Sequence, residues 1–287
     1  MVNALKTRLL PLSCLAALVT LLPAVANAGG AWTHVVEIAS SGSVEAEFAY
    51  DHQGTNLFRN QHLTIHRAGA VVLDQPVRPV QYGAVWPANF WSHGKSVFVR
   101  DLDGDGEPEV FLDLYWGGAH CCEYAQVFTY NAATNAYALT THIWGDPGVR
   151  LADLDHDGLP EFVSGDDRFA YQFTDFGDSS WPVQIWIYLG GGFYEVTQDF
   201  PLTIAADARS QWAYAFSRGS TGARKRGVLA AWAADECLLN RCVPAFRRLE
   251  ALRKSGSFRV RYVCPCDSPR AYLAHLRRFL QRTGYWR

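Results

Sequence analysis

The chain has 287 residues, of which 49% are hydrophobic and 19% charged, so it can form a packed core and is neither disordered nor collagen-like. Its 26 Lys and Arg against 28 Asp and Glu leave a net charge of -2, which gives no overall sign of nucleic-acid binding. The length suits one large domain or two ordinary ones.

The first 28 residues have the features of a secretory signal peptide. Lys6 and Arg8 precede an apolar run, and Ala26-Asn-Ala28 supplies the small residues at which signal peptidase cleaves. A membrane-spanning helix is disfavoured because two prolines interrupt the run, and a lipoprotein signal would need a Leu where Pro11 precedes Cys14. No other stretch reaches about 18 uncharged apolar residues. We therefore expect an exported protein, secreted or periplasmic, with no transmembrane segment after cleavage.

Charge divides the remaining chain into two unlike regions. Residues 29–208 carry 24 acidic and 7 basic side chains, and their short alternating apolar runs between Gly, Asn and Asp are typical of strands and tight turns. Residues 209–287 carry 4 acidic and 17 basic side chains with helical spacing, and Ser268-Pro269 provides a cap and a first-turn proline. The sequence predicts an α+β, mainly β fold, with an acidic β region followed by a basic helical region.

Two copies of one acidic loop, DxDxDGxPE, occur in the acidic region at residues 101–109 and 153–161. Carboxylates at loop positions 1, 3, 5 and 9 can converge on one hard cation, while glycine at position 6 permits the bend and position 7 offers its backbone carbonyl. Calcium accepts many oxygen ligands in loose geometry, so we expect Ca²⁺ at two sites rather than two solvated acidic turns. The predicted ligands are Asp101, Asp103, Asp105, Glu107 and Glu109 in the first loop and Asp153, Asp155, Asp157, Leu159 and Glu161 in the second.

An EF-hand or dockerin loop is the competing interpretation of these motifs. Such a loop needs an acidic ligand at position 12, where this chain has Leu112 and Ser164. It also needs helical flanks, whereas residues 97–99 and 110–112 have the pattern of strands. The sequence excludes the EF-hand on both counts.

Each loop is followed by a strand, an insertion and a strand-turn-strand hairpin, so residues 97–197 form two similar units. With the doubled loop, this pattern resembles the FG-GAP or VCBS-type calcium-binding repeats of integrin-like β-propellers and many exported bacterial proteins. The motifs YWGGAHCC at Tyr115–Cys122 and SGDDRF at Ser164–Phe169 are similar to those in a group of exported bacterial repeat proteins. The resemblance implies calcium at the acidic loop positions and a small or incomplete β-propeller-like repeat region. Glu109 and Glu161 depart from the commoner Asp, and integrin-like propellers have more loops than these two.

Removing the signal peptide leaves an even number of cysteines, which in an oxidising compartment favours disulfides over zinc. We expect the last four to staple the helical region and the first two to pair locally or with each other, although a vicinal disulfide is strained and uncommon. A transition-metal site beside His120 is disfavoured, because adjacent thiolates do not easily face one tetrahedral ion. The six are Cys121, Cys122, Cys237, Cys242, Cys264 and Cys266.

No nucleophile motif such as GxSxG, HExxH or a P-loop is present. Asp166-Asp167 offers a carboxylate pair for hydrolysis, although a structural turn explains it as well. Tryptophans near turns, such as Trp86 and Trp181, could stack on sugars, although packing in an aromatic core is the favoured explanation for most of the tryptophans. We expect a monomeric, non-catalytic binding or scaffolding protein of the cell envelope or secretome, with a protein or glycan ligand and no nucleic acid. The alternative is a secreted hydrolase or glycan-binding protein on the same calcium-stabilised scaffold.

The basic helical region admits two roles. Its cations could contact an anionic envelope polymer or lipid headgroups. Alternatively, its positive face packs on the acidic region and neutralises it within one molecule. We favour the second role, because packing of the two regions on each other accounts both for the negative charge of residues 29–208 and for the positive charge of residues 209–287.

Overall fold

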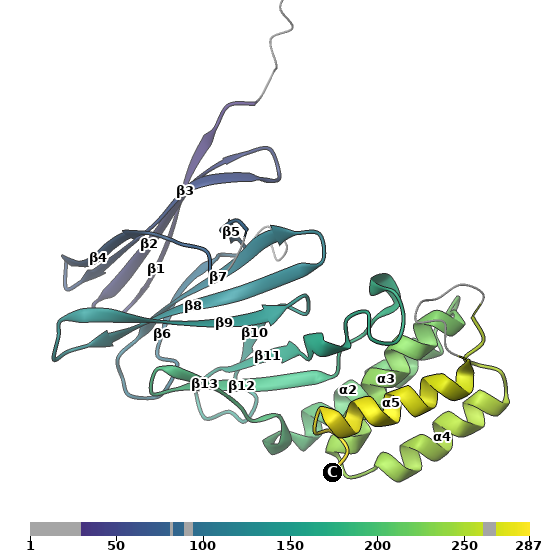
Figure 1. The fold of residues 1–287 in the computed structure, drawn as a ribbon. Helices are drawn as coiled ribbons and strands as arrows, with labels where there is room; N and C mark the ends of the chain where they lie inside the picture. Colours follow the sequence, from purple (N-terminus) through teal and green to yellow (C-terminus); the bar gives the residue numbers. More distant parts are fainter. Residues whose placement is uncertain (1–29, 81–82, 89–93, 261–267) are drawn as a thin grey trace, which may run out of the picture. The chain divides into compact units, whose positions relative to one another are not determined.

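The computed structural model of the protein describes residues 30–80, 83–88, 94–260 and 268–287. Residues 32–287 form one of two compact units, and the other, residues 1–31, lies almost wholly outside the described part, as does the predicted signal peptide. Within the larger unit, antiparallel sheets come first along the chain and α-helices follow (Figure 1). The predicted order of a β region and then a helical region is confirmed.

The first sheet is an antiparallel meander of four strands that precedes both acidic loops. Its second strand alternates strictly, with Val44, Ala46 and Phe48 buried and Glu45 exposed between them, as expected for a strand that packs one face on a core. This sheet shares its core with residues of the next sheet, such as Val97 and Leu112. The strands are β1 (Thr33–Ser41), β2 (Val44–Gln53), β3 (Leu57–Arg67) and β4 (Ala70–Pro76).

The second and third sheets repeat one plan, in which an acidic loop joins the first strand to the second and a hairpin follows. In each sheet the neighbouring strands pair antiparallel. The second sheet holds β6 (Val97–Arg100), β7 (Glu109–Gly118), β8 (Cys121–Asn131) and β9 (Ala136–Gly145), with the short β5 (Trp86–Pro87) also paired to β7. The third holds β10 (Arg150–Ala152), β11 (Glu161–Gly165), β12 (Val183–Leu189) and β13 (Gly192–Glu195).

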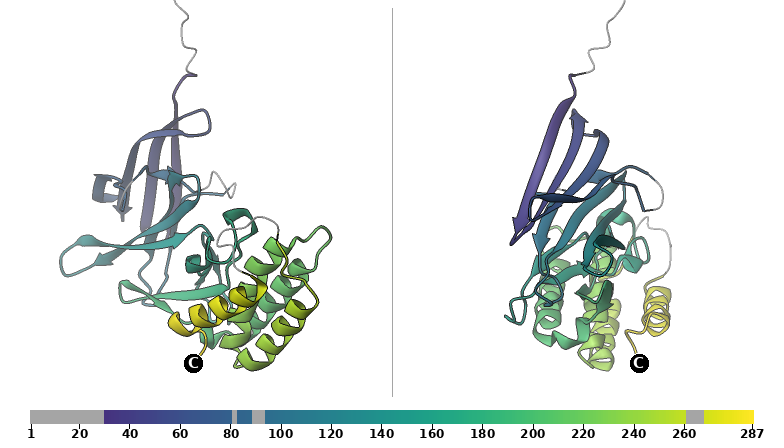
Figure 2. Two further views of the ribbon diagram at one scale, coloured as in Figure 1. Left: turned by 45° about the vertical axis from the view of Figure 1, so that its right-hand side comes forward. Right: turned by 90° about the vertical axis from the view of Figure 1, so that its left-hand side faces the viewer.

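In the described part of the chain, four helices follow the sheets and pack side by side around a core of their own (Figure 2). The Ser268 hydroxyl accepts a hydrogen bond from the Ala271 amide at 3.2 Å, so the predicted cap of the last helix is present. The segment between β11 and β12 joins this core through Phe169 and Phe173, which are both buried. The helices are α2 (Pro201–Ala215), α3 (Gly222–Leu238), α4 (Cys242–Lys254) and α5 (Pro269–Arg282).

Helix α2 was not expected from the sequence, and it begins within the region assigned to strands. Its buried positions are Ile204, Ala208 and Ala215, whereas Leu202 is 85% exposed, so its apolar pattern is weak. The helical part of the protein therefore starts at Pro201, before the predicted boundary at residue 209.

The described residues form three separate antiparallel sheets and no closed ring of blades. The observed architecture is thus a mixed α and β fold with mostly antiparallel sheets and four helices, and the propeller-like arrangement stays a prediction.

Two of the expected disulfides are present among the described cysteines. Cys237 pairs with Cys242 and links the end of α3 to the start of α4, in agreement with the predicted staple. Cys121 pairs with its neighbour Cys122, the option that the sequence disfavoured. Cys264 and Cys266 lie outside the described residues.

Candidate functional site

The two acidic loops have the same backbone form. Each is closed by a strand pair at its base, where Arg100 faces Glu109 in the first loop and Ala152 faces Glu161 in the second. Positions 4 and 6 take positive φ in both loops, with values of +85° at Gly106 and +97° at Gly158 for position 6. Only glycine adopts this conformation without strain, which explains its presence at position 6 of both copies.

Carboxylates from positions 1, 3 and 9 come together in both loops. Oxygen atoms of Asp101, Asp103 and Glu109 all lie within 4.8 Å of one another. The same limit holds for Asp153, Asp155 and Glu161 in the second loop. Three carboxylates at this separation repel one another strongly unless a cation or protons reduce their charge.

Positions 5 and 7 lie outside these carboxylate groups. Asp105 accepts a hydrogen bond from the Glu107 amide at 2.7 Å, and Asp157 accepts one from the Leu159 amide at 2.8 Å. The Glu107 carboxylate pairs with Arg67 of β3, so it is committed elsewhere. At position 7, the backbone carbonyl is therefore the atom that could face a cation. The side chains at position 5 stabilise the turn by accepting hydrogen bonds from the position 7 amides.

Glu109 provides a test of whether these residues fit a metal ion. Its side chain is fully buried, and one carboxylate oxygen accepts a hydrogen bond from the Leu102 amide at 2.9 Å. The other oxygen is buried and has no hydrogen-bond partner among the described residues, as is also true of one oxygen of Asp153. Burial, reinforced by the charges of Asp103 and Asp105, raises the pKa of Glu109 to about 7. An orphaned buried carboxylate is costly, and a hard cation would satisfy it, so the residues fit such an ion.

The two loops also touch each other and the hairpin between β12 and β13. The Arg100 guanidinium donates a hydrogen bond to the Gly158 carbonyl at 3.0 Å. A methyl group at Gly104 would approach the Leu159 side chain to 3.0 Å, which shows how closely the loops pack. The Gly190 amide donates to Asp103 at 3.2 Å. The first loop thus joins the second sheet to the third.

The two motifs that follow the loops meet in the structure. Sulfur atoms of Cys121 and Cys122 lie within 4.8 Å of an Asp167 carboxylate oxygen. The Asp146 amide donates to Asp167 at 3.3 Å, and burial together with the Asp167 charge raises the pKa of Asp146 to about 6. The sequence did not predict that the cysteines lie close to Asp167, because sequence patterns indicate contacts only between residues that are near one another in the chain.

The predicted carboxylate pair Asp166-Asp167 does not act as a pair. Asp166 forms an ion pair with Arg168 at 2.6 Å and accepts a hydrogen bond from the Tyr285 hydroxyl at 2.9 Å. Asp167 instead accepts a hydrogen bond from the amide of Asp146, which lies between β9 and β10. The motif is therefore partly a structural turn, as the alternative interpretation held, with one carboxylate left beside the cysteines.

A second pair of acidic groups is buried between β7 and β8. Burial raises the pKa of Asp113 well above its usual range and also raises that of Glu123, and the charge of Glu123 further opposes ionisation of Asp113. Glu123 accepts a hydrogen bond from the Val149 amide at 2.6 Å, whereas one Asp113 oxygen has no partner among the described residues. This pair anchors the connection between β9 and β10.

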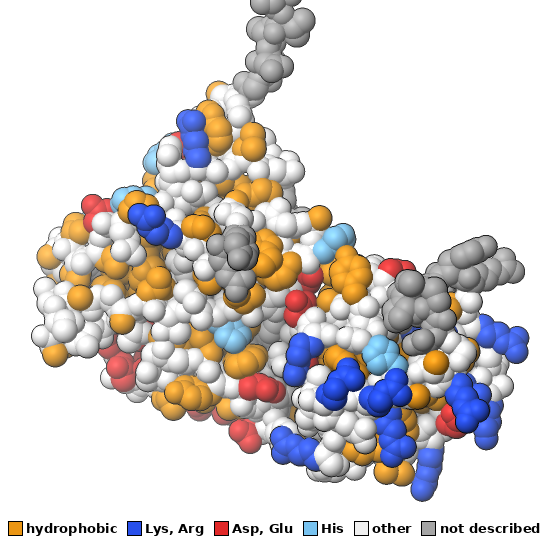
Figure 3. Space-filling view, in the orientation of Figure 1, with side chains coloured by type: hydrophobic (Ala, Val, Ile, Leu, Met, Phe, Trp, Pro, Cys, Tyr) orange, Lys and Arg blue, Asp and Glu red, His pale blue; other side chains and the backbone are white. Residues whose placement is uncertain are grey.

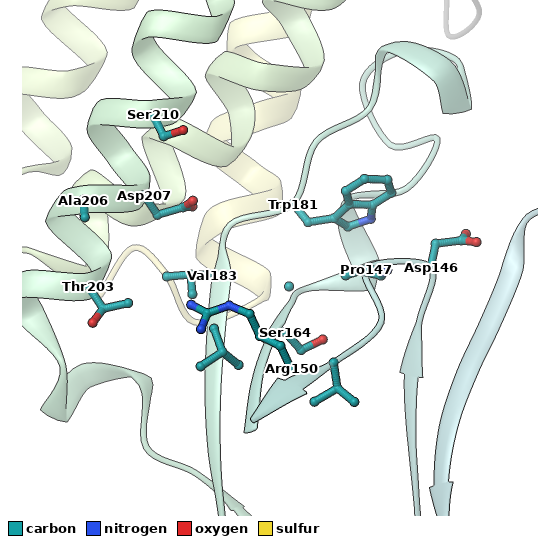
Figure 4. Close-up of a pocket in the computed structure, with 13 residues that line it drawn as sticks. Asp146, Pro147, Arg150, Ser164, Trp181, Val183, Thr203, Ala206, Asp207 and Ser210 are labelled. Atoms are coloured by element: carbon teal, nitrogen blue, oxygen red, sulfur yellow. The ribbon is translucent and has the colours of Figure 1, made fainter. Parts of the chain in front are cut away.

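A pocket of about 600 Å³ lies between strands β10–β12 and helix α2. In Figure 4, Thr203, Asp207 and Ser210 come from the helix, while Arg150 and Ser164 come from the strands opposite. Burial raises the pKa of Asp207. Trp181 and Asp146 also line the pocket, which therefore combines hydroxyl, carboxyl, guanidinium and indole groups.

Sequence reasoning did not find Arg150 and Asp207 as members of one site. They lie far apart in the chain, and neither belongs to a spaced motif. Trp181 was the one pocket residue that the sequence singled out for ligand contact, through its position next to a proline. Only the packing of α2 on the third sheet brings the three together.

Among the described residues, no helix is both long and apolar enough to cross a lipid bilayer.

Comparison with known proteins places the clearest similarity in the helical region. Residues 204–284 match the family model described as the sll0997 C-terminal domain. The chain is 32% identical over 145 residues to the "Probable thylakoid lumen protein sll0997" of Synechocystis, covering 49% of this chain and 43% of that protein. It is 25% identical over 265 residues to the "Uncharacterized protein y4bJ" of Sinorhizobium fredii, covering 86% of this chain and 40% of that protein. The chain thus spans about two fifths of the length of each relative, and no solved structure matches it.

These comparisons overturn the resemblance to FG-GAP or VCBS-type repeats. No such repeat family is found, and the matching family model covers the helical part rather than the loops. The loop motif is short and its chemistry is local, so the same carboxylate spacing can arise on unrelated folds. The two copies of the loop motif therefore indicate a shared local structure, and they are weak evidence that the chain is related to the FG-GAP or VCBS-type repeat proteins.

Proposed function

We propose that the chain is an exported, non-catalytic binding or scaffolding protein whose two acidic loops hold calcium. The observation that carries this proposal is the fully buried Glu109, which has one carboxylate oxygen without a hydrogen-bond partner among the described residues and whose carboxylate converges with those of Asp101 and Asp103. Calcium suits the site because all the converging ligand atoms are carboxylate oxygens, and this ion accepts irregular oxygen geometry more readily than magnesium.

Calcium in this position would act as a structural link. It would neutralise carboxylates at the base of both loops, and the first loop contacts the third sheet through Gly190 and Arg100. The predicted consequence is a stiffer junction between the second and third sheets, with little direct effect on the helices.

The experiment is a calcium titration by calorimetry together with thermal melts in EDTA and in calcium. Wild-type protein should bind two ions and melt at higher temperature in calcium. Asp103→Ala combined with Asp155→Ala should abolish both effects, while Asp199→Ala, an exposed aspartate outside the loops, should leave them unchanged. An equal melting temperature with and without calcium in the wild type would reject the proposal.

Export is supported by residues 6–28, which have the basic start, the apolar run and the small residues before the cleavage site that are typical of a signal peptide. It is also supported by the relative whose printed name assigns it to the thylakoid lumen, a compartment that proteins enter by translocation. Amino-terminal sequencing of protein recovered from the exported fraction should begin at Gly29, and a chain that starts at Met1 would contradict this part.

A glycan is the second candidate ligand, favoured by the pocket between the third sheet and α2. Its lining offers hydroxyl, carboxyl and guanidinium groups beside an indole, a combination that suits a polyhydroxylated ligand. A glycan array would test it. The array should give a signal for wild type that Arg150→Gln and Asp207→Asn both remove, and a signal that survives both substitutions would place the ligand elsewhere.

A further inference from the structure

Few of the basic side chains described in the helical region form ion pairs with the acidic β region. The helical region does pack on the segment between β11 and β12, through the Arg224–Asp178 ion pair, the Tyr285–Asp166 hydrogen bond and apolar contacts. Among the described residues, however, Arg224–Asp178 is the one ion pair that joins a helix to the β region. Ion pairs with the acidic region therefore do not account for the basic excess, and most of the cations, unlike the buried Arg226, lie at the surface of the helices (Figure 3).

A groove of about 500 Å³ lies between α4 and the carboxyl-terminal part of the chain. Its apolar lining includes Val243, Ala251, Phe246 and Trp286, and the last two rings pack at 4.7 Å. Val243 is 53% exposed, although it is a large aliphatic residue on a helix. Apolar surface is therefore open to an external partner in this groove.

Cations border the same groove. Arg247, Lys254 and Arg277 line it, all three are exposed, and none forms an ion pair within the described part of the chain. The single carboxylate in the lining, Glu250, is already paired with Arg253. The groove thus presents net positive charge next to exposed hydrocarbon.

Helical spacing aligns these residues in one stripe. Val243, Arg247, Ala251 and Lys254 recur every three or four positions along the exposed side of α4. An apolar helical face bordered by Lys and Arg, with a tryptophan beside it, is the composition that lies in the headgroup layer of a bilayer.

We propose that this groove between α4 and the carboxyl-terminal part of the chain binds the surface of an anionic lipid bilayer. Arg247 and Lys254 contact headgroup phosphates, Arg277 lies over the Trp286 ring at 4.6 Å and adds positive charge beside them, and the exposed Val243 faces the boundary of the acyl chains. A soluble polyanion would satisfy the cations but would leave the apolar lining in water, so the pairing of charge with hydrocarbon favours lipid. This inference is independent of the metal loops, because no residue of either loop lines the groove.

The test measures co-sedimentation of the purified full chain with vesicles of phosphatidylcholine alone or of phosphatidylcholine with phosphatidylglycerol. Protein should bind the anionic vesicles and release at high salt. Each cation held at an anionic surface contributes roughly fivefold in affinity, so Arg247→Gln combined with Lys254→Gln should weaken binding by roughly 25-fold.

The matched control is Arg209→Gln combined with Arg218→Gln, which removes the same charge from exposed positions on α2 and just after it. The control should bind within about threefold of wild type, because these residues lie outside the groove. Val243→Ser should weaken binding to vesicles while leaving any binding to inorganic polyphosphate unchanged. Circular dichroism melts of all variants establish that they are folded.

Three results would overturn the proposal. The first is no binding of the wild type to phosphatidylglycerol vesicles. The second is equal loss in both double variants, which would indicate a general charge effect. The third is binding to polyphosphate as tight as to vesicles with no effect of Val243→Ser, which would identify a polyanion site.

Discussion

Replacing Glu109 with glutamine should change the stability of the protein in opposite directions in EDTA and in calcium. Glutamine keeps the size of the side chain and an oxygen that can accept the hydrogen bond from Leu102. It removes the negative charge that is buried next to Asp103. In EDTA the variant should therefore be more stable than wild type, by about 1–3 kcal/mol, because a neutral amide costs less to bury next to other carboxylates than an ionised carboxylate does.

In calcium the same substitution removes a ligand and the charge that attracts the ion. A site filled at a hundredfold excess over its Kd stabilises the folded state by about 2.7 kcal/mol. For a chain of this size, 1 kcal/mol shifts Tm by roughly 2–4 °C, so the first loop accounts for a calcium-dependent rise of about 5–10 °C. Glu109→Gln should lose most of that rise and retain the part that comes from the second loop.

Thermal melts followed by circular dichroism, in EDTA and in calcium, measure both effects on one sample. Glu45→Gln is the matched control, because it makes the same chemical change at an exposed position on β2. The reasoning is refuted if Glu109→Gln shows the full calcium-dependent rise of the wild type, or if it is less stable than wild type in EDTA.

Three further changes have defined outcomes. Gly158→Ala places a side chain at a φ of +97° and should cost about 1–2 kcal/mol while weakening calcium binding more at the second loop than at the first, as measured by calorimetry. Asp113→Asn should raise Tm at neutral pH and have less effect as pH falls. Burial raises the pKa values of Asp113 and Glu123, so their stabilising contribution is present below the unfolded-state pKa and lost as pH rises through the folded-state pKa. Leu276→Ala removes a fully buried side chain of the helical core and should cost about 2–5 kcal/mol in denaturant melts, whereas Leu202→Ala, which is 85% exposed, should change stability by about 0.5 kcal/mol or less.

For each of these three predictions, one result would contradict the reasoning. Equal loss of calcium at both loops in Gly158→Ala would show that the substitution disturbs more than its own turn. A Tm difference for Asp113→Asn that is the same at every pH would mean that titration of the buried pair does not control stability. Similar costs for Leu276→Ala and Leu202→Ala would contradict the assignment of the helical core.

The acidic loops were predictable because their determinants lie within nine consecutive residues. The spacing of Asp101, Asp103 and Glu109 brings these carboxylates together once Gly106 takes positive φ, and no distant part of the chain is needed. The strands on either side followed from alternation in the same way. Whether calcium binds remains a prediction, since the local pattern specifies the ligands and not the occupant.

Features that depend on long-range packing were not predictable. Helix α2 has few large apolar residues on its buried side and uses Ala208 and Ala215 instead, so helical periodicity was faint. The meeting of Asp146 with Asp167 needs β9 and β11 to lie close together, which no spacing in the sequence encodes. The loop motif was also a poor guide to kinship, because a short local pattern can arise on unrelated folds.

The contact between the two loops bears on how the protein would take up its ions. The Gly158 carbonyl accepts a hydrogen bond from Arg100, and Gly104 lies close to Leu159, so a backbone change in one loop can be transmitted to the other. Occupancy of one loop must then alter the affinity of the other, and the two effects are equal in size. Uptake of calcium would therefore be cooperative or anticooperative rather than independent. A single substitution in either loop would change both steps of the binding curve.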